Sequence, residues 1–275
     1  EDIEERHNAI RFEGVYMNCG VWVNGNKAGE WKYGYTTFEF DISKLVKKGQ
    51  NDILVIVVYQ NINTRWYSGA GIFRDVTYIN TPKTYLISDG IYFTAKPENP
   101  EKLDDKWNIK ISSEIAGDSN ECTVCHKIIG KDGKLFTEFE GNGKEFSFTV
   151  SAPHLWDIND PYFYCLKTEL KDKNGKLLDK NRQNIGFKYA VFTNDKGFFL
   201  NGRHVKINGV CHHHDLGALG SAFDKEAQRR QFFKLKQMGV NSIRTSHNPP
   251  PTAWLDLCDE MGLMVDDEAY DMWEQ

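Results

Sequence analysis

The last quarter of the chain changes its pattern of apolar residues, and this change constrains the fold more than any other feature. Three short apolar runs are typical of strands: residues 204–211, 240–245 and 263–266. The two segments between them have helical spacing: residues 224–239, with Asp224 as N-cap, and residues 249–262. Each of these helices ends on a glycine, a residue that readily takes the left-handed conformation that closes helices. The order strand, helix, strand, helix, strand predicts a parallel α/β fold.

The first 190 residues, in contrast, have the pattern of strands only. Residues 21–26 (VWVNGN) predict a strand that runs into an Asn-Gly hairpin turn. Residues 53–58 (ILVIVV) form a continuous apolar run, which is typical of a strand buried on both faces. Between residues 84 and 190, short strands at regular spacing predict a second sandwich of immunoglobulin-like type. The polar stretch 96–106 is expected to be an exposed loop.

Composition and charge exclude several classes of protein. The net charge is −5 and no long basic run occurs, so we expect no binding to nucleic acid. No apolar run reaches the length of a membrane span, so we expect no membrane partner. The acidic start of the chain, EDIEE, does not resemble a signal peptide. Aromatic residues make up 13%, which suits both β-sheet cores and stacking against sugars, and composition alone favours the cores.

The 6 cysteines are scattered, and only Cys122 and Cys125 have a suggestive spacing. They lie in a strand-like run, where residues three apart point to opposite faces of a sheet. Such a pair cannot easily share a metal ion or form a disulfide. We therefore expect free thiols, which favours a reducing compartment such as the cytoplasm without assigning one.

Three motifs, in order along the chain, resemble glycoside hydrolases of family 2, of the β-galactosidase type. Residues 65–76 (RWYSGAGIFRDV) look like the end of that family's jelly-roll sugar-binding domain. Residues 155–162 (LWDINDPY) resemble the signature of its immunoglobulin-like domain. Residues 241–249 (NSIRTSHNP), followed by 258–263 (CDEMGL), are similar to the first signature of its catalytic barrel. The resemblance covers essentially the whole chain.

The resemblance implies a mainly β chain with an α/β end, divided into three domains. Residues 1–82 would be the later part of the jelly-roll domain, and residues 83–190 the immunoglobulin-like sandwich. Residues 191–275 would be the first three strands of a (β/α)₈ TIM barrel. A complete barrel takes roughly 250 residues, so the sequence would cover only its beginning.

The family's catalytic carboxyl groups are not expected in this chain. Retaining glycosidases need two carboxyls about 5 Å apart, and in this family both are glutamates after the fourth and seventh barrel strands. The acid/base glutamate follows an Asn, but the one such pair here, Asn120-Glu121, lies in the predicted sandwich. Asp267 and Glu268 are adjacent at a strand end and would point to opposite faces. The chain alone is therefore expected to have no glycosidase activity.

What the resemblance places in this chain is the rim that positions the sugar. His213 and His247 match two family histidines that bind the substrate, and Arg244 would orient carboxylates. Asp267 would hold either a sugar hydroxyl or an arginine. A jelly-roll loop would reach the mouth of the barrel with three further residues: Arg65, Trp66 and Tyr67. The alternatives are an exposed loop histidine at 213, a structural salt bridge at 244 and a plain surface loop at 65–67.

Two segments of the sequence bear on metal binding. The run CHHHD over residues 211–215 holds three histidines, but alternation along the strand separates His213 from its neighbours. Some family members bind Mg²⁺ or Na⁺ near the active site, and residues 270–273 (YDMW) supply no matching ligand set. No cofactor is therefore expected from the sequence.

The resemblance implies an enzyme that hydrolyses terminal non-reducing β-galactosides with retention, acting on a carbohydrate, with homo-oligomerisation left open. Residues 267–273 (DEAYDMW) favour a galactosidase, but Asn248 stands where many family members have Tyr. A β-glucuronidase or a β-mannosidase of the same family is therefore an alternative. A different class is a non-catalytic carbohydrate-binding protein built on the two sandwiches, and a weaker one is a purely structural interaction domain.

Overall fold

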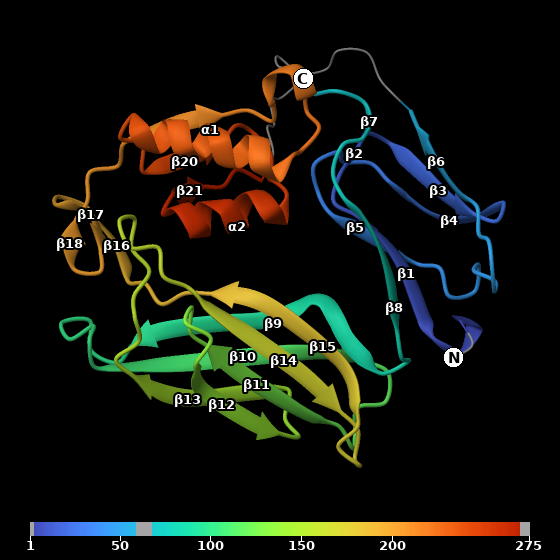
Figure 1. Cartoon of the computed structure of the whole chain (residues 1–275), viewed down its shortest axis with the longest axis horizontal. Helices are drawn as coiled ribbons and strands as arrows, with labels where there is room; N and C mark the ends of the chain where they lie inside the picture. Colours follow the sequence, from blue (N-terminus) through green and yellow to red (C-terminus); the bar gives the residue numbers. More distant parts are fainter. Residues whose placement is uncertain (1–2, 59–67, 270–275) are drawn as a thin grey trace. The chain divides into compact units, whose positions relative to one another are not determined.

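A computed structural model describes residues 3–58 and 68–269, and the chain divides into two compact units. The first unit combines Glu1–Asn80 with Asn208–Gln275, and the second is Thr81–Ile207. The regular structure of the described residues is mainly strand, with two α-helices near the C-terminal end (Figure 1). No helix in the described ranges is long and apolar enough to cross a membrane.

The N-terminal part of the first unit is a β-sandwich. One sheet has the order β5 (Phe38–Asp41), β1 (His7–Phe12), β8 (Val76–Thr81), and another has the order β4 (Asn26–Trp31), β3 (Cys19–Val23), β6 (Ile53–Val57). A short pair, β2 (Val15–Tyr16) with β7 (Gly71–Ile72), and a 3₁₀ turn, η1 (Ile3–Glu5), complete it. Its core contains Ile10, Phe12, Val21 and Phe38.

The hairpin between β3 and β4 confirms the predicted Asn-Gly turn. Val23 pairs with Asn26, so only two residues form the loop. Both of them, Asn24 and Gly25, have positive φ angles of 50° and 81°. Turns of this type match the right-handed twist of the flanking strands, which is why Asn-Gly selects them.

The prediction that residues 53–58 form a strand buried on both faces is wrong. In β6, Val55 and Val57 pack on the sandwich core, but Ile53, Leu54 and Ile56 are 45%, 56% and 46% exposed. Among the described residues, β6 pairs with β3 alone and so stands at the edge of its sheet. A continuous apolar run shows how much apolar surface a strand carries, but not whether a neighbour covers it.

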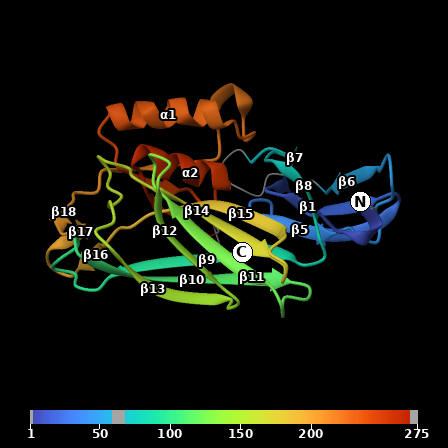
Figure 2. The same cartoon turned by 60° about the horizontal axis from the view of Figure 1, so that its bottom comes forward.

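The C-terminal part of the first unit has the predicted alternation of strands and helices. Three parallel strands lie in chain order: β19 (Gly209–His212), β20 (Ser242–Thr245) and β21 (Met264–Asp266). The helices α1 (Lys225–Gln237) and α2 (Thr252–Met261) lie side by side, as Figure 2 also shows. Phe232, Ile243, Trp254 and Leu257 are at the centre of their shared core.

The helix ends are those expected from sequence. The Asp224 side chain accepts a hydrogen bond from the Ala227 amide at 2.7 Å, which satisfies one donor of the first turn. Gly239 and Gly262 follow the helices with φ angles of 85° and 68°. A short 3₁₀ turn, η2 (Gly217–Leu219), lies between β19 and α1.

The first predicted strand of this series, residues 204–211, is wrong at its start. The strand β19 begins only at Gly209, because the Val205 amide donates to Phe198 and extends another sheet. The Asn208 amide then donates to the side chain of Asn241 at 2.8 Å, which starts the pairing with β20. The chain therefore changes sheets inside a segment that looks like one strand.

The second unit is an immunoglobulin-like sandwich, as predicted. One sheet has the order β13 (Glu145–Ser151), β10 (Lys106–Ala116), β9 (Tyr85–Pro97). The facing sheet has the order β12 (Leu135–Gly141), β11 (Thr123–Ile129), β14 (Tyr164–Lys171), β15 (Leu177–Ile185). Trp107, Ile109 and Ile111 of β10 share one core with Ile128 and Leu166 of the other sheet.

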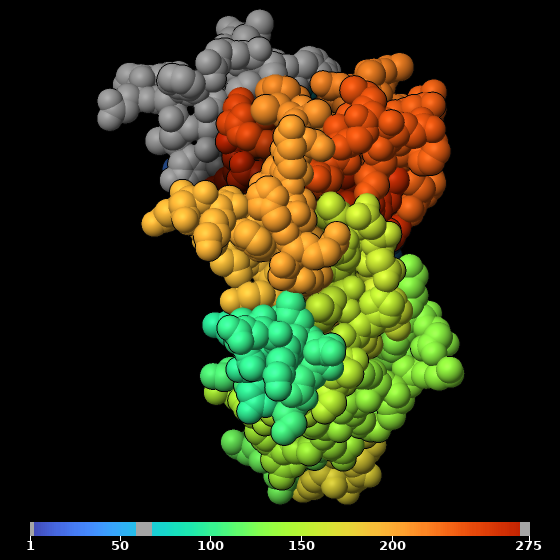
Figure 3. Space-filling view, turned by 90° about the vertical axis from the view of Figure 1, so that its left-hand side faces the viewer, coloured from blue at the N-terminus to red at the C-terminus, as the bar shows by residue number. Residues whose placement is uncertain are grey.

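This unit also contains an exposed loop and a small three-stranded sheet. Residues 98–105 form an almost entirely exposed loop, which contributes to the turquoise patch in Figure 3. The loop predicted at 96–106 is therefore correct at its centre, but residues 96–97 belong to β9 and residue 106 to β10. A small sheet follows the sandwich: β16 (Ala190–Thr193), β17 (Gly197–Leu200) and β18 (Arg203–His204). The compact unit that contains the sandwich runs from Thr81 to Ile207 and includes this small sheet.

Candidate active site

Polar side chains gather where the three parallel strands end. The register pairs Cys211 with Arg244 and Arg244 with Asp266, so the strands end at similar heights. The residues that follow these ends are brought to one edge of the sheet: His213 after β19, His247 after β20, and Asp267 and Glu268 after β21. Active sites of parallel β/α folds are built at this edge, because loops from several strands converge there.

The carboxylate of Glu268 is the centre of this cluster. Its Oε1 accepts a hydrogen bond from Arg244 Nε at 2.7 Å and also contacts Arg244 Nη2. Its Oε2 lies 2.7 Å from His247 Nδ1. The three side chains remain 38%, 20% and 25% exposed for Arg244, His247 and Glu268. They therefore form a charged group that solvent or a ligand can reach.

The contacts of His247 assign its protons. Nδ1 lies 3.2 Å from Arg244 Nη2 and 2.7 Å from the Glu268 carboxylate. A guanidinium offers only donors, whereas a carboxylate accepts, so the shorter contact indicates that Nδ1–H donates to Glu268. With Nδ1 protonated, Nε2 is an acceptor when the ring is neutral and a second donor when the ring is protonated.

Charge and hydrogen bonding set the ionisation of this cluster. Burial raises the pKa of Glu268, but hydrogen bonds from His247 and Arg244, with their charges, outweigh burial and hold it below its usual value. The Cys211 thiol, 3.4 Å from Arg244 Nη1, has a lowered pKa because Arg244 and Ser246 both contact it. At neutral pH, Glu268 is thus an anion that balances the charge of Arg244.

Asp267 and Glu268 diverge, as expected for neighbours at a strand end. Asp267 Oδ1 accepts from the buried Thr245 hydroxyl at 3.0 Å, while Glu268 is directed to Arg244 and His247. The same hydroxyl accepts from the Glu268 amide at 2.8 Å. Thr245 thus ties the end of β21 to that of β20 and holds the two carboxylates on different sides.

His213 lies against the cluster, whereas its two neighbours do not. Its ring centroid is 5.5 Å from that of His247, edge to face. His212 is hydrogen bonded to Gln231 at 2.7 Å, and His214 to the Asn248 carbonyl at 3.0 Å. Burial lowers the pKa of His214 to about 3. The three histidines therefore point to different partners and do not converge on one point.

The structure therefore brings His213, Arg244 and His247 together and sets Asp267 beside them. It adds Glu268, whose place beside Asp267 in the sequence suggested only one half of a false catalytic pair. The available signal was its position two residues after the end of a strand, and this signal does not reveal its partners. Arg65, Trp66 and Tyr67 lie outside the described residues, as does the segment 270–273.

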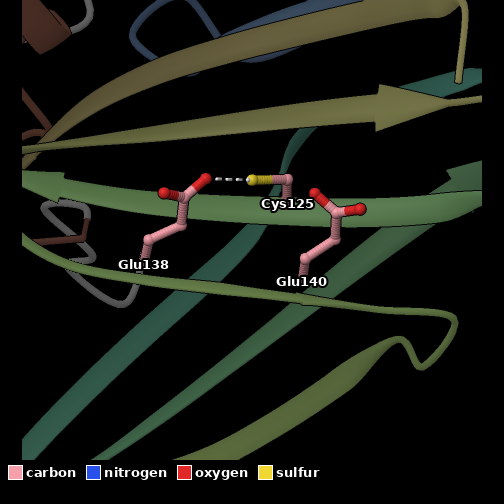
Figure 4. A group of neighbouring side chains, drawn as sticks. All are labelled: Cys125, Glu138 and Glu140. Atoms are coloured by element: carbon pink, nitrogen blue, oxygen red, sulfur yellow. Dashed lines mark hydrogen bonds between the residues drawn. The ribbon is translucent and has the colours of Figure 1, made fainter.

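A second cluster of potential metal ligands lies on β11 and β12, in the sandwich of the second unit. The Cys125 thiol donates to Glu138 at 3.2 Å, and Glu140 is beside it (Figure 4). Burial raises the pKa of Cys125 to about 12, so the thiol stays protonated. Lys127 and Lys171 pair with the two glutamates. This protonated, lysine-neutralised group is better suited to ion pairing than to holding a metal ion.

The six cysteines are all free thiols, as expected from their spacing. Cys122 is part of the sandwich core, whereas Cys125 contacts Glu138. The two residues thus face opposite sides of their sheet, which is why they form no disulfide.

Comparison with protein families identifies the chain. Three models of one family match successive segments: "Glycosyl hydrolases family 2, sugar binding domain" at residues 1–82, "Glycosyl hydrolases family 2" at 93–188, and "Glycosyl hydrolases family 2, TIM barrel domain" at 191–272. The chain belongs to glycosyl hydrolases family 2. Its first sandwich is accordingly the family's sugar-binding domain, and its β19–β21 series is the start of the family's TIM barrel.

Individual relatives agree with this assignment. The chain is 40% identical to beta-galactosidase BoGH2A of Bacteroides ovatus over 97% of its own length and 32% of that protein. It is 34% identical to a putative beta-glucuronidase of Formosa agariphila, over 97% of the chain and 26% of that protein. A crystal structure of a beta-glycosidase from Bacteroides vulgatus superposes with a TM-score of 0.92 at 36% identity, over 98% of the chain and 35% of that structure. The chain thus spans about a quarter to a third of the length of these relatives.

Proposed function

We propose that this chain supplies the substrate-binding rim of a glycosidase that hydrolyses terminal non-reducing β-galactosides with retention of configuration. The observation that carries the proposal is the group Arg244–Glu268–His247 at the C-terminal ends of parallel strands, in a chain of family 2. The two catalytic glutamates would come from later barrel strands of a protein that carries this chain. The chain alone would then bind sugar weakly and hydrolyse nothing.

In this proposal, His247 contacts a sugar hydroxyl through Nε2. Glu268 holds Nδ1–H and so directs Nε2 away from itself. A hydrogen bond to a hydroxyl that strengthens as charge develops on the sugar ring lowers the barrier of glycoside cleavage. Arg244, whose guanidinium is shared between Glu268 and Ser246, would fix the distance between β20 and the residues that follow β21.

The charge balance of the cluster favours a neutral sugar over a uronate. A glucuronide carries a carboxylate, which is best bound by an unbalanced cation. The guanidinium of Arg244 is already paired with Glu268, so this cluster has no cationic excess to offer. The name of the relative at 40% identity agrees with a galactoside. β-Glucuronidase is the second candidate, because the relative at 34% identity has that name.

The test is an assay of a full-length protein that carries this chain followed by the rest of a barrel. Nitrophenyl β-galactoside, β-glucuronide and β-mannoside are compared, and the first-formed anomer is followed by NMR. The proposal expects the galactoside to have the highest kcat/KM and the product to be β first. A preference for the glucuronide, or an α product, would contradict the substrate or the stereochemistry. Activity of the isolated 275-residue chain that persists in His247→Ala would contradict the division of roles.

A further inference from the structure

Arg74 is a buried cation whose only described hydrogen-bond partners are backbone carbonyls. It is 6% exposed and lies after β7. Its Nη1 donates to the carbonyls of Tyr35 at 2.8 Å and Glu13 at 3.2 Å, and its Nη2 donates to the carbonyl of Pro249 at 2.8 Å. Within the described ranges, it forms no ion pair with a carboxylate. Its guanidinium therefore joins two segments of the sugar-binding sandwich to one segment of the barrel.

Burying the Arg74 guanidinium in this way is energetically unfavourable. A buried charge without a counter-ion is unfavourable, and burial lowers the pKa of Arg74 to about 10. Carbonyl dipoles offset part of this penalty, as does the face of Phe73, whose centroid is 4.9 Å from the guanidinium carbon. An apolar side chain of similar length would fill the volume without that penalty. What only a planar, forked guanidinium can do is to hold three carbonyls from three segments in one geometry.

The barrel segment that Arg74 holds is the loop that carries His247. Pro249 is two residues beyond His247, and α2 begins at Thr252. The intervening Asn248 is 3% exposed and is fixed at both ends: its carbonyl accepts from His214, and its side chain accepts from the Tyr33 hydroxyl. Tyr33, like Arg74, belongs to the sandwich. Two sandwich residues therefore grip the two residues that follow His247.

His214 links these contacts to one another. Its ring lies 4.8 Å from the ring of Tyr35, whose carbonyl Arg74 also holds. Burial, with the nearby charge of Arg74, keeps His214 neutral, with a pKa of about 3. A neutral ring can donate from Nε2 to the Asn248 carbonyl without adding a second buried cation. The sandwich and the loop thus share a single hydrogen-bonded seam, made of Tyr33, Arg74, His214, Asn248 and Pro249.

We propose that Arg74 is a positioning residue of the active site. By clipping Pro249 to the sandwich, it fixes the loop that sets His247 against Glu268 and directs its Nε2 to the substrate. The sugar-binding domain thereby takes part in the barrel reaction without touching the sugar through this residue. The proposal rests on the proposed glycosidase function for its kinetic consequence, and on the loop geometry alone for its structural one.

The kinetic test is a double-mutant cycle in the full-length protein. Arg74→Met and His247→Ala are made singly and together, and Val21→Ala in the sandwich core is the control for simple destabilisation. If Arg74 acts through His247, Arg74→Met lowers kcat/KM at least tenfold, mainly through kcat. His247→Ala then costs much less in the Arg74→Met background than in the wild type, because the loop is already misplaced. When Val21→Ala is combined with His247→Ala instead, the fold-changes in kcat/KM of the two substitutions are expected to multiply, because the two sites are independent.

Independent effects of Arg74→Met and His247→Ala, or a loss of activity no larger than that of Val21→Ala at matched melting temperature, would overturn the proposal. If Arg74→Met does not fold, Arg74→Lys replaces it in the test. Lysine keeps the positive charge but lacks the planar, forked guanidinium that binds three carbonyls. Arg74→Lys is expected to lose activity with little change in melting temperature.

The structural test does not depend on catalysis. Amide hydrogen exchange of the peptide 243–250 is compared in the wild type, Arg74→Met or Arg74→Lys, and Val21→Ala. At least tenfold faster exchange in the Arg74 variants alone supports the clip, and equal exchange in all variants overturns it. If the wild type cleaves none of the three nitrophenyl glycosides, the proposed function fails, while this measurement still decides the role of Arg74.

Discussion

The two units each contain a histidine in a polar group, but the two groups are built in opposite ways. In the second unit, His126 is fully buried between Ser113 and Thr168, with its ring nitrogens 3.4 Å and 2.9 Å from the two hydroxyls. In the first unit, His247 is partly exposed, between Arg244 and Glu268. One group is closed, uncharged and internally satisfied, whereas the other is charged and partly open to solvent.

This difference indicates whether each histidine contributes to stability or to activity. Ser113 belongs to one sheet of the sandwich and His126 and Thr168 to the other, so the closed group joins two sheets. Burial lowers the pKa of His126 to about 4, which keeps the ring neutral. A closed neutral group specifies a core, whereas an open charged group can respond to a substrate. We therefore expect changes at His126 to affect stability and changes around His247 to affect activity.

The largest expected effect is that of His126→Ala on stability. The change leaves a cavity and two buried hydroxyls without their partner, and should lower the free energy of unfolding by about 3–4 kcal/mol. Denaturant unfolding of the 275-residue chain, followed by Trp fluorescence, measures it. A loss below about 1 kcal/mol would mean that the closed group is not a structural element of the core.

Acidification should lower the stability of the fold through His126. Because the folded-state pKa of His126 is about 4 and that of an unfolded histidine is about 6.5, the unfolded state binds more protons between these values. The stability contribution is therefore complete above pH 6.5 and is lost as the pH falls towards 4, by about 3 kcal/mol in total. Melting curves from pH 7.5 to 4 test this, and His126→Asn is the control that should flatten the dependence. A slope equal in both proteins would exclude His126 as its source.

At the open group, Glu268→Gln should lower activity and leave stability almost unchanged. The substitution keeps the size of the side chain but removes the charge that holds His247 and balances Arg244. We expect kcat/KM of the full-length enzyme to fall about 10–100-fold, the worth of a hydrogen bond to a charged group, while the melting temperature changes little. Kinetics and a thermal melt on the same preparation distinguish the two effects. Parallel losses would show that Glu268 is structural.

The smallest expected effect is at the second charged cluster, on the surface of the sandwich. Glu138→Gln keeps an oxygen that can accept from the Cys125 thiol but removes the negative charge of that acceptor and one ion pair of Lys127. Surface ion pairs contribute little, so the free energy of unfolding should change by less than about 0.5–1 kcal/mol. Isothermal calorimetry with Zn²⁺ gives a second readout, with no binding expected for either protein. Tight Zn²⁺ binding lost in Glu138→Gln would contradict the view of this cluster as ion pairs.

Much of the architecture could be predicted from local patterns. The Asn-Gly turn, the cap at Asp224 and the glycines at 239 and 262 depend on the conformations that single residues allow, which act over a few residues. The strand–helix alternation predicted that His213, Arg244 and His247 would lie at or just after strand ends, and parallel pairing then brought them to one edge. Periodicity and capping act along the chain, so the sequence is sufficient to show them.

What the sequence determined by itself is therefore the order and type of the elements, and the family to which its motifs belong. The tertiary structure alone decided that β6 exposes apolar residues at a sheet edge, that residue 205 belongs to a different sheet from residue 209, and that Glu268 joins Arg244 to His247. It also decided that Arg74 reaches Pro249, 175 residues away in sequence. Burial, ion pairing and clips between segments depend on which distant residues meet, and this is set by packing in three dimensions rather than by any local pattern.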